Sequence, residues 1–243
     1  DINENYYEVL LRLKGTDGHL IAPGAFLPAA ERYNLMPAID RWVIQRFFRY
    51  LSTANEGWIS PATPLTNSLL PATSSLDASL PGASFYAINL SGASLNDDTF
   101  ISFVREQFET YNISPRKICF EITETVAIAN LSRATELITD LRQLGCQFAL
   151  DDFGTGMSSL AYLKALPIDY LKIDGNFIRG ITQDQFSQAV VRAVNNIGHL
   201  IGLKTVAEFV STPAILETVK TLGIDFVQGH GIATPAPLPS RAE

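Results

Sequence analysis

The feature of this sequence that most restricts its fold is a regular alternation of short β-rich runs with longer amphipathic helical patterns. The β-rich runs lie at residues 7–13, 85–90, 117–122, 147–151, 170–173, 204–208 and 225–228. Several of them are almost continuously apolar, which is typical of strands in a parallel sheet covered on both faces. Repeated units of a strand followed by a helix predict either a closed barrel or a doubly wound sheet.

The helical patterns lie between these runs, at residues 37–50, 98–111, 131–144, 183–197 and 212–222. Pro37 stands in a first-turn position, where its missing N–H is tolerated. Gly145 follows the third pattern and predicts a helix end there. The chain has 243 residues, of which 47% are hydrophobic and 18% charged. It is therefore long enough and apolar enough to build one large α/β barrel.

One segment, residues 52–84, interrupts the alternation. It is rich in Ser, Thr, Pro and Ala, and its only charged residues are Glu56 and Asp77. We expect a long surface loop, inserted into a single domain that spans residues 1–243, with a lid or partner-binding loop as the alternative. The chain opens with Asp1 rather than an initiator Met, so we also expect it to be a piece of a longer multidomain protein.

Composition argues against several classes of protein. The net charge of −7 does not suit a protein that binds duplex nucleic acid, which would need a basic face. Cys119 and Cys146 lie in apolar runs without a CxxC spacing, which predicts buried free thiols and a cytoplasmic location. No apolar run approaches the roughly 18 residues that a membrane span needs, and the polar opening residues predict no signal peptide.

Polar residues stand at the end of almost every predicted strand, where βα barrels carry their functional side chains. They are Asn89, Glu121, Asp151, Asp152, Lys172, Glu208 and Gln228, and Glu8 lies inside the first apolar run. One such residue alone is often just the start of a solvated loop. A set of carboxylates that converges on one barrel mouth repels itself unless nearby positive charge offsets it, and a single Lys is too little.

Hard divalent cations are the predicted counterions. Carboxylate and amide oxygens without His or Cys favour Mg²⁺ or Mn²⁺ over Zn²⁺. The adjacent pair Asp151-Asp152 allows one carboxylate to bridge two ions, and two ions about 3.5–4 Å apart suit in-line hydrolysis of a phosphodiester. A metal-dependent barrel enzyme acting on a small carbon acid shares this pattern and is an alternative. The histidines, His19, His199 and His230, are scattered and offer no rival site.

The same residues lie in segments that resemble the EAL domain family. Glu8-Val9-Leu10-Leu11-Arg12 is similar to the Glu-Ala-Leu-x-Arg motif that names the family, with Val in place of Ala. The segment at residues 23–31 is similar to the family's next segment. The remaining motifs follow in the family's order: Asn89-Leu90-Ser91, Glu121-Ile122-Thr123-Glu124, Asp151-Asp152-Phe153-Gly154-Thr155-Gly156, Lys172-Ile173-Asp174, Ala207-Glu208 and Gln228-Gly229.

The resemblance implies a (βα)8 TIM-like barrel of the EAL type, with the family's usual first strand absent from this chain. It implies hydrolysis of cyclic di-GMP to linear pGpG, with two Mg²⁺ or Mn²⁺ ions, in bacterial second-messenger signalling. It also implies a cytoplasmic domain that forms a homodimer through barrel loops and is flanked by sensory or cyclase domains, with a membrane tether through domains outside this chain as an alternative.

Residue roles carry over from the resemblance position by position. Glu8, Asn89, Glu121 and Asp151 match the ligands of one metal ion, and Asp151, Asp152 and Glu208 match positions around the second. The positions that match catalytic residues are Lys172, Glu208 and Asp152, with Lys172 holding and polarising a water molecule. Those that match substrate-binding residues are Arg12, Leu10 and Gln228. Glu124 matches a glutamate that braces the loop after Asp151-Asp152.

The chain departs from the family pattern at four positions. Phe209 and Ser211 stand where the family usually has Gly and Glu, Met157 replaces a frequent Tyr, and Thr234 replaces a Lys or Arg. The alternative function is a cyclic di-GMP receptor that binds without cutting. Because such receptors typically lose metal ligands and this chain keeps the whole set, the sequence favours catalysis.

Overall fold

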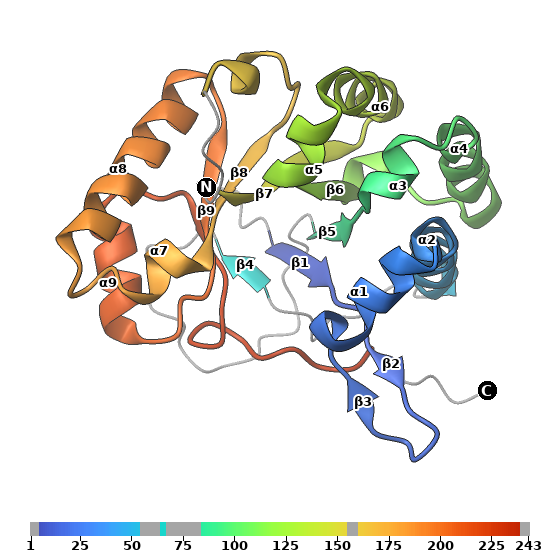
Figure 1. Ribbon diagram of the computed structural model, residues 1–243, viewed down its shortest axis with the longest axis horizontal. Helices are drawn as coiled ribbons and strands as arrows, with labels where there is room; N and C mark the ends of the chain where they lie inside the picture. Colours follow the sequence, from blue (N-terminus) through green and yellow to red (C-terminus); the bar gives the residue numbers. More distant parts are fainter. Residues whose placement is uncertain (1–4, 54–63, 67–83, 155–159, 239–243) are drawn as a thin grey trace.

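Eight strands close into a barrel in the order β1-β4-β10-β9-β8-β7-β6-β5 (Figure 1). The computed structural model describes residues 5–53, 64–66, 84–154 and 160–238. Neighbouring strands of the barrel pair in parallel, except for the two pairs that include β4. The strands that run parallel are β1 (Asn5–Val9), β5 (Ser84–Asn89), β6 (Ile118–Thr123), β7 (Gln147–Phe153), β8 (Tyr170–Ile173), β9 (Lys204–Ala207) and β10 (Phe226–Val227). The predicted α/β barrel is confirmed.

The remaining barrel strand, β4 (Pro64–Thr66), comes from the segment for which we predicted a loop. It pairs antiparallel with β1, with Tyr6 opposite Leu65, and with β10, with Val227 opposite Thr66. The prediction of loop structure is therefore wrong at these three residues. It is also wrong at the two ends of the segment, where α2 continues to Thr53 and β5 begins at Ser84. The rest of the segment lies outside the described residues.

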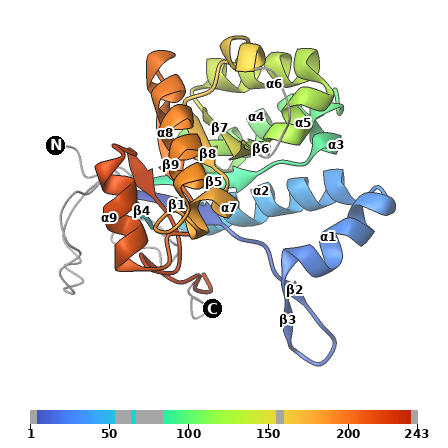
Figure 2. The same cartoon turned by 60° about the vertical axis from the view of Figure 1, so that its left-hand side comes forward.

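Helices surround the barrel and cover the outer faces of its strands (Figure 1). The described helices are α1 (Pro23–Arg32), α2 (Met36–Thr53), α3 (Gly92–Leu95), α4 (Phe100–Tyr111), α5 (Glu124–Ala129), α6 (Leu131–Leu144), α7 (Gly175–Arg179), α8 (Gln185–Leu200) and α9 (Pro213–Thr221), with 3₁₀ turns η1 (Pro115–Lys117) and η2 (Leu160–Lys164). A hairpin of β2 (Leu13–Lys14) and β3 (Leu20–Ile21) projects from the body beside α1 (Figure 2).

Local signals explain where α6 begins and ends. The Asn130 side chain accepts a hydrogen bond from the Arg133 N–H, and this cap satisfies one of the N–H groups that a first turn leaves free. Gly145 ends the helix in the left-handed region, with φ at 108°, which glycine adopts without steric cost. Both signals are visible in the sequence, and the observed helix has the predicted bounds.

Alternation along the strands divides the core into two parts. Outward side chains of the strands pack against the helices in a large apolar cluster that includes Ile88, Phe120 and Leu150. Inward side chains form a smaller cluster inside the barrel: Tyr6, Ala87, Cys119, Ala149, Tyr170, Val206 and Phe226. Strand side chains alternate between the two faces of the sheet with a period of two. The side chain two residues further along each strand therefore also points into the barrel, directly above this inner cluster, which we call the apolar floor.

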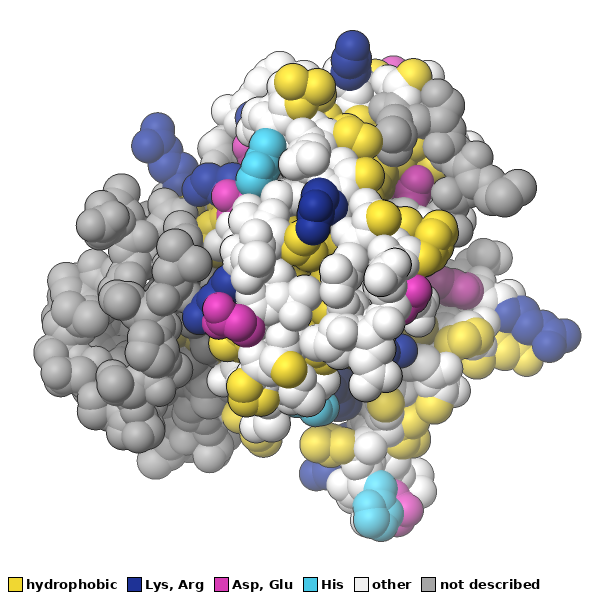
Figure 3. Space-filling model, turned by 90° about the vertical axis from the view of Figure 1, so that its left-hand side faces the viewer, with side chains coloured by type: hydrophobic (Ala, Val, Ile, Leu, Met, Phe, Trp, Pro, Cys, Tyr) yellow, Lys and Arg dark blue, Asp and Glu magenta, His cyan; other side chains and the backbone are white. Residues whose placement is uncertain are grey.

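The predicted burial of the two cysteines is confirmed. Cys119 and Cys146 are buried free thiols. Basic and acidic side chains are interspersed on the face shown in Figure 3. None of the helices in the described part of the chain combines the length and apolarity that a membrane-spanning segment requires.

Candidate active site

A polar layer lies two residues beyond the apolar floor in seven strands. The successive floor and layer residues are Tyr6 and Glu8, Ala87 and Asn89, Cys119 and Glu121, Ala149 and Asp151, Tyr170 and Lys172, Val206 and Glu208, and Phe226 and Gln228. Because a strand returns to the same face every second residue, each polar side chain points into the barrel above its floor residue. Seven motifs far apart in sequence therefore meet at the carboxyl ends of the parallel strands.

Lys172 lies at the centre of this layer. Its ammonium Nζ is 2.9 Å from Glu121 Oε2, 3.1 Å from Asp151 Oδ1 and 3.0 Å from Glu208 Oε1. The Lys172 side chain is only 1% exposed and that of Glu121 is fully buried. A buried charge is tolerated only when it is paired and hydrogen-bonded, and here one cation serves three carboxylates.

The pKa values of the layer reflect a shortage of positive charge. Burial alone would lower the pKa of Lys172, but the carboxylates around it, led by Asp151 and Glu121, raise it well above the ordinary value. Burial also raises the pKa of Glu121 far above its usual range, although Lys172 opposes this shift. Burial raises the pKa of Glu208 to about 7. Carboxyl groups that are hard to ionise are expected where several share too few cations.

Glu8 is held from two sides by amides. Asn89 Nδ2 donates to Glu8 Oε1 at 2.8 Å, and Gln228 Nε2 donates to Glu8 Oε2 at 2.5 Å. Both amides thus use their nitrogens on Glu8, which leaves their oxygens for other partners. The buried Gln228 Oε1 accepts no hydrogen bond from the described residues. A buried acceptor without a partner is costly, so this oxygen is available to a bound ligand.

The residues present fit a site for hard divalent cations. Oxygen atoms of Asp151, Asp152 and Glu208 all lie within 4.8 Å of one another. Burial, with Asp151 nearby, raises the pKa of Asp152 to about 6. Asp152 also has a positive φ of 54°, an unfavourable backbone conformation for a residue with a side chain. Carboxylate and amide oxygens are the ligands that Mg²⁺ and Mn²⁺ prefer.

Glu124 connects α5 to the turn that follows Asp151-Asp152. Its buried carboxylate accepts a hydrogen bond from the Gly154 N–H at 3.0 Å and another from the Tyr162 hydroxyl at 2.6 Å. Gly154 has φ at 103°, so the turn passes through a second left-handed residue just after Asp152. The loop residues 155–159, which include Met157, lie outside the described residues.

Replacing Glu124 with Ala should lower the free energy of unfolding by about 1–3 kcal/mol, because the Gly154 N–H and the Tyr162 hydroxyl lose their acceptor. Urea denaturation of the variant measures this. The matched control is Glu109→Ala, which removes an exposed glutamate from α4. Equal stability of the two variants would show that Glu124 does not brace the turn.

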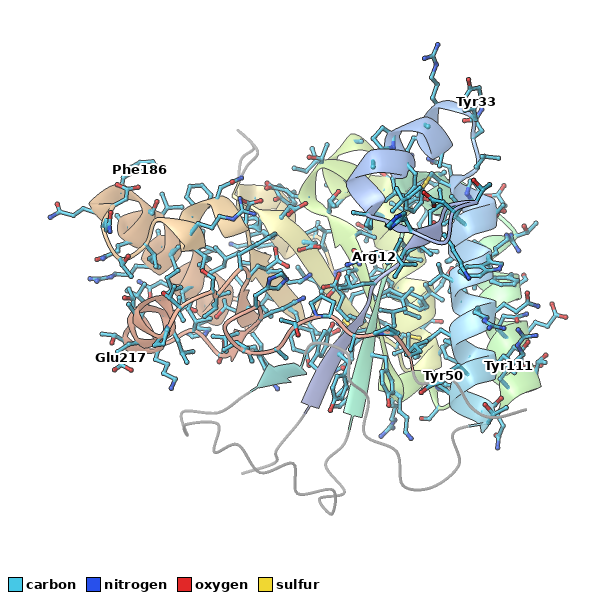
Figure 4. All side chains as sticks on the ribbon, turned by 90° about the horizontal axis from the view of Figure 1, so that it is seen from below. Arg12, Tyr33, Tyr50, Tyr111, Phe186 and Glu217 are labelled. Carbon is cyan, nitrogen blue, oxygen red and sulfur yellow. The ribbon has the colours of Figure 1, made fainter. Side chains whose placement is uncertain are left out.

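A cavity of about 1040 Å³ opens above the polar layer and is lined by residues from both sides of the barrel. All three residues predicted to bind substrate, Leu10, Arg12 and Gln228, lie in its wall. Arg12 follows β1 and is exposed near the barrel mouth (Figure 4), where its Nη1 donates to the Leu11 carbonyl at 2.7 Å. The volume exceeds that of most single-ligand pockets and suits a ligand the size of a dinucleotide.

Asp40 also lines the cavity and was not among the predicted site residues. It is 4% exposed, and its Oδ2 accepts hydrogen bonds from the Ser91 N–H, the Ser91 hydroxyl and the Ser94 hydroxyl. One signal could have revealed it: Asp40 lies on the buried stripe of α2, four residues from both Met36 and Ile44. A carboxylate on the apolar stripe of a helix requires buried hydrogen-bond donors.

Fold and site together define the class of this protein, a βα barrel whose mouth holds an acidic centre suited to hard divalent cations. The EAL domain family matches residues 3–235. The chain belongs to the EAL domain family, and the resemblance carried by its motifs is confirmed.

Similar proteins include named phosphodiesterases. The chain is 38% identical over 236 residues to the cyclic di-GMP phosphodiesterase PdeB of Shewanella oneidensis, covering 97% of this chain and 25% of that protein. It is 36% identical over 233 residues to the cyclic di-GMP phosphodiesterase PdeF of Escherichia coli, covering 96% of this chain and 28% of that protein. The chain thus spans about a quarter of the length of these relatives.

Solved structures share the fold over nearly the whole chain. A structure titled PaMucR phosphodiesterase, c-di-GMP complex, is 30% identical with a TM-score of 0.80, covering 97% of this chain and 90% of that one. The FimX EAL domain of Pseudomonas aeruginosa bound to c-di-GMP is 26% identical with a TM-score of 0.80, covering 95% of this chain and 84% of that one.

Proposed function

We propose that this chain is a phosphodiesterase that hydrolyses cyclic di-GMP to linear pGpG with two Mg²⁺ or Mn²⁺ ions. The observation that carries the proposal is the polar layer, in which one buried ammonium faces three carboxylates and further oxygen donors surround them. The negative charge of this layer exceeds its positive charge, which favours the binding of cations. The similarity to PdeB and PdeF, which are named cyclic di-GMP phosphodiesterases, supports cyclic di-GMP as the substrate.

Each layer residue has a proposed part in the chemistry. Glu8, Asn89, Glu121 and Asp151 hold one ion, and Asp151, Asp152 and Glu208 hold the other. When bound, the two ions activate a water molecule and neutralise the charge that develops on the phosphate.

The other polar residues of the site orient the reactants. Lys172 is paired with three carboxylates, which restrict its position. One of its three N–H groups would donate to the attacking water once a bound ion takes over one of these carboxylates. Arg12 binds a phosphate of the substrate, for which the fork of its guanidinium is suited. Leu10 and Gln228 line the wall against which the substrate lies.

The direct test is incubation of the purified chain with cyclic di-GMP and Mn²⁺, followed by chromatography of the nucleotides. We expect pGpG to accumulate. Binding of cyclic di-GMP without any pGpG would support the second candidate, a receptor that does not cut. One observation favours that candidate: Phe209 and Ser211 depart from the family pattern.

Calcium should inhibit the reaction that manganese supports. Ca²⁺ coordinates more oxygen atoms at longer distances than Mg²⁺ or Mn²⁺, so it should occupy the acidic centre and misplace the attacking water. Initial rates of pGpG formation in Mn²⁺, with and without added Ca²⁺, measure the effect. Equal rates in Ca²⁺ alone and Mn²⁺ alone would contradict this account of the metal centre.

The setting of the domain is proposed in the same terms. We propose that it works in the cytoplasm, within a longer protein that carries sensory or cyclase domains, and that it pairs with a second copy through barrel loops. The proposal of a longer protein is supported by the length of the relatives, of which this chain spans about a quarter.

A further inference from the structure

Two side chains on the cavity wall form a pair that the proposed metal chemistry does not use. The guanidinium carbon of Arg179 lies 4.1 Å from the centroid of the Phe209 ring, within the range of a cation–π interaction. Both residues line the cavity. Phe209 follows Glu208 directly, so the pair stands beside the acidic centre.

The local structure accommodates Phe209 at a cost. Phe209 has φ at 52°, a conformation that glycine adopts freely and a bulky residue does not, and its side chain is 49% exposed. The ring also needs Gly175, because a Cβ at that position would lie 2.0 Å from Phe209 Cδ2. An exposed aromatic ring on a strained backbone, fitted against a glycine, gains little from burial, which points to a role in binding.

Arg179 is free to bind a ligand. It forms no salt bridge or hydrogen bond with the residues that the structure describes, and it is exposed at the end of α7. The other arginine in the cavity wall is Arg12, which follows β1. Figure 1 places α7 across the barrel from α1 and α2, so the cavity extends from the α1 side to the Arg179 side.

We propose that Arg179, held against the ring of Phe209, recognises one guanine base of cyclic di-GMP; this inference rests on the proposed substrate. An arginine fork donates two hydrogen bonds to O6 and N7 of guanine, and aromatic rings and guanidinium planes bind nucleobases by stacking. A phosphate group cannot stack on an aromatic ring, so the presence of Phe209 favours a base as the ligand. Adenine carries an amino donor where guanine has O6, so Arg179 selects guanine over adenine.

The test compares the binding of two cyclic dinucleotides that differ only in their bases. Dissociation constants for cyclic di-GMP and cyclic di-AMP are measured in Ca²⁺, with chromatography of the nucleotides to verify that neither is cleaved. Arg179→Ala should lower the preference for cyclic di-GMP over cyclic di-AMP about tenfold or more. Phe209→Leu, which removes the support of the ring, should lower the same preference by about threefold. Gly175→Ala should act like Phe209→Leu and have no further effect in that background.

Two matched variants control for unspecific effects. Arg105→Ala removes an exposed arginine from α4, and Phe186→Leu removes an exposed ring at the start of α8, far from the mouth where Arg12 lies (Figure 4). Both should keep the wild-type preference. If Arg179→Ala lowered the affinity for both dinucleotides equally, Arg179 would bind a phosphate and the inference would be wrong. An unchanged preference for cyclic di-GMP over cyclic di-AMP in this variant would also overturn it.

The outcome also separates this inference from the proposed function. If the wild-type protein converts cyclic di-GMP to pGpG but its base preference does not depend on Arg179, the proposed function stands and this inference is wrong. Wild-type protein that binds neither dinucleotide and forms no pGpG removes both.

Discussion

Replacing Lys172 with Met should lower the melting temperature of the metal-free protein by about 10 °C. Lys172 is buried and shared by Glu121, Asp151 and Glu208, so its loss leaves carboxylates without their partner. Removing one partner of a buried ion pair costs about 3–5 kcal/mol, and 1 kcal/mol shifts the melting temperature of a domain of this size by about 2–4 °C.

The same variant should regain much of its stability when Mn²⁺ is added. A divalent cation bound among the carboxylates supplies the charge that the ammonium no longer provides, and a ligand that binds only the folded state stabilises it. Turnover should stay low even in Mn²⁺, because the donor that holds the water is missing.

Thermal denaturation in chelator and in Mn²⁺ separates these effects. The control is Lys164→Met, which removes an exposed lysine from η2 and should change the melting temperature little in either condition. If Lys172→Met were as stable as the control without metal, the three ion pairs would contribute nothing. If Mn²⁺ failed to restore stability, the carboxylates would not form a metal site.

Replacing Glu8 with Ala should reduce pGpG formation by roughly a thousandfold or more, the scale at which electrostatic groups of an active site contribute. The change removes a proposed metal ligand and leaves the Asn89 and Gln228 side-chain amides without the acceptor that they share. The fold should persist, because Glu8 lies above the apolar floor and not within it.

Initial rates in Mn²⁺, with circular dichroism to verify folding, measure this prediction. Glu8→Gln keeps the size of the side chain and removes its charge, so it should be nearly as inactive as Glu8→Ala. The matched control is Glu106→Ala, which removes an exposed glutamate from α4. Cleavage by Glu8→Ala at a rate near that of the control would show that the metal centre has been assigned to the wrong residues.

The alternation of strands and helices predicted a closed barrel or a doubly wound sheet, and the resemblance to the EAL domain family pointed to the barrel. The helix at Leu131–Leu144 was predicted with its observed bounds because Gly145 marks its end. The first strand was predicted too far along the chain. Leu10 and Leu11 extend the apolar run, but the strand ends at Val9 and these leucines line the cavity instead.

The sequence patterns missed α1 and β4 for different reasons. α1 contains Pro28, which usually interrupts a helix, and its ten residues were not predicted as one. β4 lies in a segment rich in Ser, Thr and Pro, where composition favours a loop. Its three residues form a strand because β1 and β10 offer unpaired edges on either side, a tertiary reason that no local pattern contains.

The polar residues of the site were predictable because they share a position in seven strands, two residues beyond an inward apolar residue. Lys172 and the three carboxylates around it were each predicted as site residues, but their pairing was not, since the carboxylates come from β6, β7 and the end of β9. Arg179 and Phe209 were harder still. Their contact depends on the conformations of α7 and of the turn after β9, which the strand pattern does not determine.

Side chains at the ends of five strands, β1, β5, β6, β7 and β9, are proposed to hold a pair of divalent cations. Anomalous diffraction at the manganese edge, from crystals of the chain soaked in Mn²⁺, tests this central claim most directly. We expect two peaks about 3.5–4 Å apart, with oxygen ligands from Glu8, Asn89, Glu121, Asp151, Asp152 and Glu208. Absence of manganese from the barrel mouth at saturating Mn²⁺, or a single ion bound elsewhere, would contradict the claim.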